Sequence, residues 1–144
     1  MSIVECQASR VGSGRLTDKG FFGFENLEVY QLAKALFLKI LPLITQLPKE
    51  EIFALSDQLR RASSSVVLNI AEGKGRGSDR DFVRYLYQAR GSLLEAVAAL
   101  DLAETCGYLN RAQTQAYLDA AHTLNAKLTS LIKSLSKKPS SPRP

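Results

Sequence analysis

The sequence predicts an all-α fold, an antiparallel up-down-up-down four-helix bundle. Apolar residues recur at steps of three and four along four long segments, which is the period of an amphipathic helix. Glycine, proline and capping residues separate these segments, and no segment alternates apolar and polar residues as a strand does. Because the connections are short, neighbouring helices are expected to be antiparallel. A chain of 144 residues is long enough for one such domain.

The first helix is predicted from about residue 26 to residue 46. Pro42 lies inside this pattern and is expected to kink the helix or to end its regular part early, because proline lacks a backbone donor. The apolar stripe consists of Leu27, Tyr30, Ala33, Phe37, Ile40, Leu41 and Ile44.

The second helix is predicted to start after Pro48, where Glu50 and Glu51 suit the positive end of a helix dipole. Glycines at positions 73, 75 and 77 end it. Its apolar stripe is Ile52, Leu55, Leu59, Ala62, Val66 and Ile70.

Capping residues mark the third and fourth helices. Ser78 or Asp79 caps the third helix, Gly107 ends it, and Asn110 caps the fourth. The third stripe is Phe82, Leu86, Ala89, Leu93, Val97, Leu100 and Ala103, and the fourth is Tyr117, Ala121, Leu124, Leu128, Leu131 and Leu135.

The bundle is expected to occupy residues 23–136. Residues 1–22 are interpreted as a flexible arm, and residues 137–144 as a disordered basic tail rich in proline and serine. No apolar run approaches the roughly 18 residues of a membrane span, and the first residues do not resemble a secretory signal. We therefore expect a cytoplasmic protein with no membrane partner, in which Cys6 and Cys106 are free thiols.

Catalytic and metal-binding patterns are weak. The chain has one histidine, His122, whereas a di-iron bundle needs several Glu and His ligands and a hydrolytic triad needs a nucleophile motif. The segment Gly73-Lys74-Gly75-Arg76-Gly77 lacks the order of a phosphate-binding loop and follows a helix rather than a strand. We expect no enzymatic activity, no metal and no cofactor.

Basic residues gather between positions 60 and 90 in a chain whose formal net charge is +5. Such a surface attracts nucleic-acid phosphates, although a solvated turn that is basic by chance is an equally open interpretation. The candidate nucleic-acid-binding residues are Arg60, Arg61, Lys74, Arg76, Arg80 and Arg84.

Three polar residues, Asn69, Glu72 and Glu95, lie on or beside the apolar stripes of the second and third helices. A buried carboxylate must be paired. The structural interpretation is that the carboxylates meet arginines or backbone donors and set the helix register, with Arg61 as the expected partner of Glu72 or Glu95. The functional alternative is a polar ligand site between these helices.

Small and apolar residues away from the stripes indicate packing on a second side. Gly91 lies in the middle of the third helix, where glycine costs about 1 kcal/mol relative to alanine. A close helix crossing, within the bundle or between subunits, is therefore expected there. Apolar residues outside the stripes would be exposed in a monomer, so we expect an oligomer. They include Phe53, Val67, Leu68, Tyr85, Tyr87 and Leu94.

Several motifs in the right order resemble one known family. They are Phe24-Glu25-Asn26-Leu27-Glu28-Val29-Tyr30-Gln31-Leu32-Ala33, Leu47-Pro48-Lys49-Glu50-Glu51, Gln58-Leu59-Arg60-Arg61-Ala62, Asn69-Ile70-Ala71-Glu72-Gly73, Phe82 with Tyr85-Leu86, and Ala89-Arg90-Gly91-Ser92-Leu93-Leu94-Glu95. The chain resembles the four-helix-bundle proteins of the 23S rRNA intervening sequences, or S23 proteins, which are similar in fold to the accessory variability determinant of diversity-generating retroelements.

The resemblance implies a homopentameric, barrel-like ring. In the retroelement relative a positively charged ring binds nucleic acid and a reverse transcriptase, whereas the family name itself records a gene location rather than an activity. The leading hypothesis is therefore a non-catalytic oligomer that binds RNA or DNA through a basic surface. The alternative is a protein–protein scaffold or regulatory partner without nucleic-acid binding.

Overall fold

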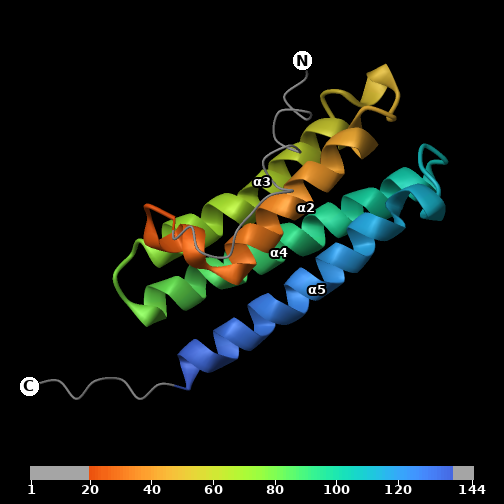
Figure 1. Ribbon diagram of the computed structural model, residues 1–144. Coiled ribbons are helices and arrows are strands. Elements are labelled where there is room, and N and C mark those ends of the chain that lie inside the picture. Colours follow the sequence, from red (N-terminus) through yellow and green to blue (C-terminus); the bar gives the residue numbers. More distant parts are fainter. Residues whose placement is uncertain (1–19, 138–144) are drawn as a thin grey trace, which may run out of the picture.

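The computed structural model describes residues 20–137, and within this range all regular secondary structure is helical, with no strand. Four α-helices lie side by side (Figure 1), and the predicted all-α class is confirmed. The expected arm up to residue 19 and the expected tail from residue 138 lie outside the described range. The elements are η1 (Gly23–Asn26), α2 (Glu28–Ile44), η2 (Lys49–Glu51), α3 (Leu55–Lys74), α4 (Asp79–Thr105) and α5 (Arg111–Ser136), where η denotes a short 3₁₀-helix.

The predicted helix caps are present. The side chain of Ser78 accepts a hydrogen bond from the backbone N–H of Asp81 at 3.2 Å, and that of Asn110 accepts one from the N–H of Gln113 at 3.0 Å. Each bond satisfies a donor that the first turn of a helix leaves unpaired. Gly107 follows α4 with a φ of +77°, a left-handed conformation that favours glycine after a helix.

The beginning of α3 differs from the prediction. After Pro48 the chain forms the 3₁₀ turn η2, and Ala54 has a non-helical backbone (φ −121°, ψ −100°). The α-helix therefore starts at Leu55, and Ile52 lies outside it with 51% of its surface exposed. Because neither glycine nor proline stands at this break, the sequence shows no local sign of it.

The buried face of α2 also differs from the predicted stripe. Val29, Leu36 and Leu43 are buried, whereas Tyr30, Phe37 and Leu41 are only partly buried. Apolar residues occur around most of this helix, so its period does not select one face. Pro42 does not end the helix, which continues to Ile44.

All four α-helices contribute to one core, whose largest buried side chains include Tyr117, Leu36, Ile40, Leu59, Leu86 and Leu124. The most extensive packing is between α3 and α4. Their polar pairs run from Gln58 with Glu95, through Ser65 with Ser92, to Glu72 with Tyr85, so the end of α3 lies beside the start of α4. No helix in the described range has the length and apolar character to cross a membrane.

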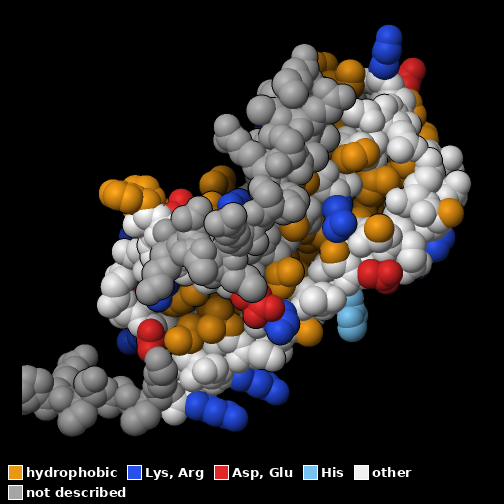
Figure 2. All heavy atoms as spheres, in the orientation of Figure 1, with side chains coloured by type: hydrophobic (Ala, Val, Ile, Leu, Met, Phe, Trp, Pro, Cys, Tyr) orange, Lys and Arg blue, Asp and Glu red, His pale blue; other side chains and the backbone are white. Residues whose placement is uncertain are grey.

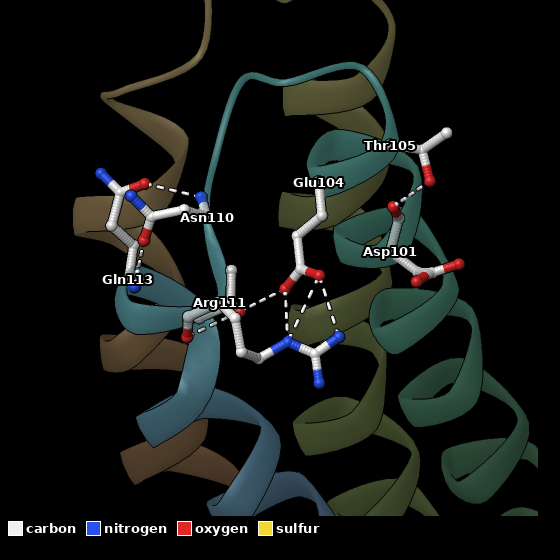
Figure 3. A network of polar contacts seen from close by, with 7 residues as sticks. Asp101, Glu104, Thr105, Asn110, Arg111 and Gln113 are labelled. Carbon is white, nitrogen blue, oxygen red and sulfur yellow. Dashed lines mark hydrogen bonds and ion pairs between the residues drawn. The ribbon is translucent and has the colours of Figure 1, made fainter.

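A polar network joins α4 to α5 at the turn between them (Figure 3). The guanidinium of Arg111 donates to the carboxylate of Glu104 through Nε at 3.1 Å and Nη2 at 2.9 Å. The hydroxyl of Thr114, which is fully buried, donates to the same carboxylate. The hydrogen bonds from Arg111, and then from Thr114, hold the pKa of Glu104 below its usual 4.5.

Because the pKa of Glu104 is lowered in the folded protein, the free energy of unfolding depends on pH. A depressed folded-state pKa contributes stability above the unfolded pKa, and this contribution is lost as pH falls through the folded value. We expect Glu104→Gln to lower the unfolding temperature at neutral pH and to flatten its decline between about pH 5 and pH 3. Thermal unfolding followed by circular dichroism measures both. Parallel declines for the variant and the unmodified protein would contradict the assignment.

Candidate functional site

The turn between α3 and α4 carries the glycine-rich basic segment. Gly75 caps the end of α3, Gly77 has a φ of +82°, and Ser78 begins α4. The left-handed Gly77 lets the chain reverse over four residues between the two helices. Lys74, Arg76 and Arg80 are thereby exposed around one turn.

Below this turn α3 approaches α4 very closely. Gly73 is buried, and a Cβ atom at this position would lie 2.5 Å from the Cβ of Tyr85 and 3.2 Å from the ring of Phe82. Glycine, which has no Cβ atom, is the residue that lets the two helices come this close. Phe82 and Tyr85 are buried, with 5% and 9% of their surfaces exposed. The prediction that Tyr85 belongs to a spare outer surface is therefore wrong.

The two buried rings support three of the candidate cations. The guanidinium carbons of Arg76 and Arg84 lie 5.0 Å and 5.4 Å from the centre of the Tyr85 ring. The ammonium of Lys74 lies 5.7 Å from the centre of the Phe82 ring. Cation–π contacts of this kind restrict long side chains and leave their outer faces in water.

Glu72 connects these groups. Its Oε1 atom accepts from Nη2 of Arg76 at 2.5 Å and from the hydroxyl of Tyr85 at 3.3 Å. This hydrogen bond with Glu72 is the largest cause of the raised pKa of Arg76. The guanidinium of Arg76, in the turn, is therefore held over the ring by a carboxylate near the end of α3, four residues earlier.

The structure divides the predicted set of cations. Arg60 and Arg61 lie in the first half of α3, and at 1.5 Å per residue Arg60 is about 20 Å along the helix from Lys74. Arg61 pairs with Asp57 at 2.9 Å, not with Glu72 or Glu95 as expected. Arg60 lines a separate hollow of about 400 Å³ with Ile44, Thr45, Leu47, Lys49, Ile52, Phe53, Ser56 and Asp57.

The other two polar candidates, Asn69 and Glu95, also have partners within the chain. The amide of Asn69 donates to the backbone oxygen and the hydroxyl of Ser65, both at 2.9 Å, and so stays within α3. Glu95 is exposed and accepts a hydrogen bond from Gln58 across the α3–α4 contact. Neither contact involves an arginine.

The sequence reasoning missed two residues that shape this site, Gly73 as a contact point and Tyr85 as a platform. One available signal was the spacing of Phe82 and Tyr85, which places both on one face of the first turns of α4. Among the residues that the structure describes, no group of three or more His, Cys, Asp or Glu is arranged to hold a metal ion. His122 is exposed.

Comparison with known proteins identifies relatives by family and by structure. The family model of the 23S rRNA-intervening sequence protein matches residues 25–130. A similar solved structure is a protein of unknown function from the S23 ribosomal protein family of Bacteroides thetaiotaomicron, with 26% identity and a TM-score of 0.67. That match covers 73% of this chain and 98% of the other. No curated protein matches the sequence. The chain therefore belongs to the 23S rRNA-intervening sequence protein family.

Proposed function

We propose that this chain is a non-catalytic, oligomeric protein that binds RNA or DNA through one end of its helical bundle. The binding surface consists of Lys74, Arg76, Arg80 and Arg84, which we call the basic end. The observation that carries the proposal is the arrangement of Arg76 and Arg84 over the ring of Tyr85, with Lys74 over Phe82. These cations are oriented before any ligand arrives, which reduces the conformational entropy lost on binding.

The chemistry of these side chains suits phosphate. A guanidinium offers a planar set of donors that matches two phosphate oxygens, and Arg84 is exposed. From Glu72 to Arg90 the sequence has five basic and three acidic residues, and Glu72 is already bound to Arg76 and Tyr85. Five basic residues against three acidic ones leave this segment a formal charge of +2, which favours an anionic polymer.

The test is a binding titration of the whole protein with labelled single-stranded and duplex RNA and DNA. Anisotropy is followed from about 50 to about 200 mM salt, a range over which phosphate-mediated affinity falls steeply. The proposal predicts measurable binding at the lowest salt and a linear fall of log affinity with log salt concentration. No binding at about 50 mM salt to any of the four probes would overturn it.

We further propose that the helices form an antiparallel up-down-up-down bundle and that five copies assemble into a homopentameric ring. The order of the α3–α4 polar pairs supports the topology. The outer face of α4 supports self-association, because apolar or small residues recur there at helical spacing. Exposed members of this α4 face are Tyr87, Gly91, Leu94, Ala98 and Leu102.

Leu94→Asp should break this assembly. The side chain of Leu94 is 52% exposed in the single chain, so a carboxylate there is tolerated by the monomer but costly in a dry interface. Sedimentation should show smaller particles with unchanged helix content, whereas Ala126→Asp on an exposed position of α5 should sediment as the unmodified protein. An unmodified protein that sediments as a monomer would refute the assembly.

The α4 face also favours a second candidate function, a scaffold that binds another protein. Half-exposed Tyr87 and Leu94 would suit a partner helix as well as a second copy. Affinity capture from a native lysate, with and without nuclease, separates the two functions. Partners that survive nuclease favour the scaffold, and partners that disappear favour nucleic-acid binding.

A further inference from the structure

Two phenylalanines stand in solvent just before the first long helix. Phe21 is 93% exposed and Phe22 is 57% exposed. Their rings meet edge to face with centroids 5.2 Å apart, and Phe22 lies parallel to Phe24 at 5.9 Å. Phe24 in turn meets the edge of Tyr30 at 4.9 Å. A continuous series of rings thus leads from water to α2.

The backbone that carries these rings is fixed by polar contacts. The N–H of Gly20 donates to the side chain of Asn26 at 2.9 Å, and the N–H of Phe22 donates to the carboxylate of Glu25 at 3.0 Å. The side chain of Gln31, in α2, donates to the backbone oxygen of Glu25 at 2.7 Å. The backbone that carries the two rings is therefore held in place, and the fold leaves both rings exposed to solvent.

The segment that carries the two rings lies at the end of the bundle that also carries Lys74, Arg76, Arg80 and Arg84. η1 packs against α2 and α3, and Figure 1 places it beside the end of α3 and the turn into α4. Figure 2 shows apolar side chains projecting at this end of the molecule. Two carboxylates of this segment have partners: Glu25 accepts from the backbone N–H of Phe22, and Glu28 pairs with Lys127 at 3.3 Å.

We propose that Phe21 and Phe22 are a stacking platform for unpaired bases, so that the ligand is single-stranded nucleic acid or an unpaired segment of a folded RNA. The inference rests on the proposed function, because the phosphates of the same strand contact the basic end. Base faces are available for stacking only where a strand is unpaired, whereas a duplex hides them between neighbouring base pairs. Exposed aromatic rings beside a cationic surface are the combination that proteins binding single strands use.

The stacking platform distinguishes single strands from duplexes, which net charge alone does not. Positive charge attracts single strands and duplexes alike through their phosphates. Stacking on Phe21 and Phe22 adds affinity for the single strand alone. Because every base has a flat face, the platform should favour unpaired strands with little dependence on sequence.

The test compares Phe21→Ala/Phe22→Ala with the unmodified protein on four probes of about 16 nucleotides or base pairs: single-stranded RNA, single-stranded DNA and the two duplexes. The matched control is Phe53→Ala, which removes a ring that is 95% exposed and lies before α3. We expect the double variant to lose about tenfold or more in affinity for single strands and to keep its duplex affinity. Phe53→Ala should bind all four probes as the unmodified protein does.

A second readout follows stacking itself. A 2-aminopurine base in the single-stranded DNA should lose fluorescence on binding the unmodified protein, and this quenching should disappear with Phe21→Ala/Phe22→Ala. If the double variant loses equal affinity for single strands and duplexes, or loses none, the stacking proposal is wrong. The proposed nucleic-acid binding at the basic end is not contradicted by that result. A changed sedimentation of the double variant would assign the rings to contact between copies instead. If the unmodified protein binds none of the probes, the proposed function itself is wrong.

Discussion

Replacing Lys74, Arg76 and Arg80 together with alanine should weaken nucleic-acid binding and flatten its dependence on salt. Each cation that contacts a phosphate releases counterions, and for single strands three such cations contribute about 2 to the slope of log affinity against log salt. The three side chains surround one exposed turn, so their loss need not disturb the core. Anisotropy titrations at several salt concentrations measure the slope, and circular dichroism checks the helices.

The matched control removes the same charge from the other end of the molecule. Lys49, Arg60 and Arg61 lie in η2 and the first half of α3, and all three are exposed. The Lys49→Ala/Arg60→Ala/Arg61→Ala variant has the same net charge as the basic-end variant but keeps the basic end. We expect it to retain most of the affinity and the slope. Equal losses in the two variants would mean that net charge, rather than a site, governs binding.

Gly73→Ala should destabilise the protein, although alanine is the better helix former. The new Cβ would lie 2.5 Å from the Cβ of Tyr85, which cannot move away without shifting α4. Overpacking of this kind costs about 1–3 kcal/mol, against about 1 kcal/mol gained in helix propensity. We expect a net loss of up to about 2 kcal/mol in the free energy of unfolding, measured by urea denaturation. Nucleic-acid affinity should fall as well, because the ring of Tyr85, which supports Arg76 and Arg84, is displaced.

Gly91→Ala is the matched control for that substitution. Gly91 also lies inside a helix, but a Cβ atom added there would meet no neighbouring side chain or helix within 4 Å, so the change should not destabilise the single chain. In the Leu94→Asp background, where the α4 face makes no contact between copies, it should raise the free energy of unfolding by up to about 1 kcal/mol. A Gly73→Ala variant as stable as the unmodified protein would contradict the close approach of α3 and α4.

The features predicted correctly from sequence are those set by local chemistry. Ser78 and Asn110 cap helices because their side chains reach the backbone two or three residues ahead, and Gly107 ends a helix because it tolerates a positive φ. The all-helical class follows from periodicity, which each segment displays by itself.

The features that sequence reasoning missed depend on contacts between segments. The burial of Tyr85 and the need for glycine at position 73 both arise where α3 meets α4, and neither residue reveals its partner alone. Arg60 and Lys74 belong to one basic region in sequence but are separated by about 20 Å of helix. Charge clustering along a chain therefore predicted a site larger than the one that the fold assembles.

Hydrogen–deuterium exchange of the whole protein, with and without single-stranded RNA, tests the central claim most directly. Binding at the basic end predicts slower exchange in residues 73–84, and stacking on Phe21 and Phe22 adds slower exchange in residues 20–27. Neither predicts a change in residues 49–61. These two protected segments are far apart in sequence but lie at one end of the bundle (Figure 1). Protection confined to residues 49–61, or RNA binding that leaves residues 73–84 unprotected, would contradict the account.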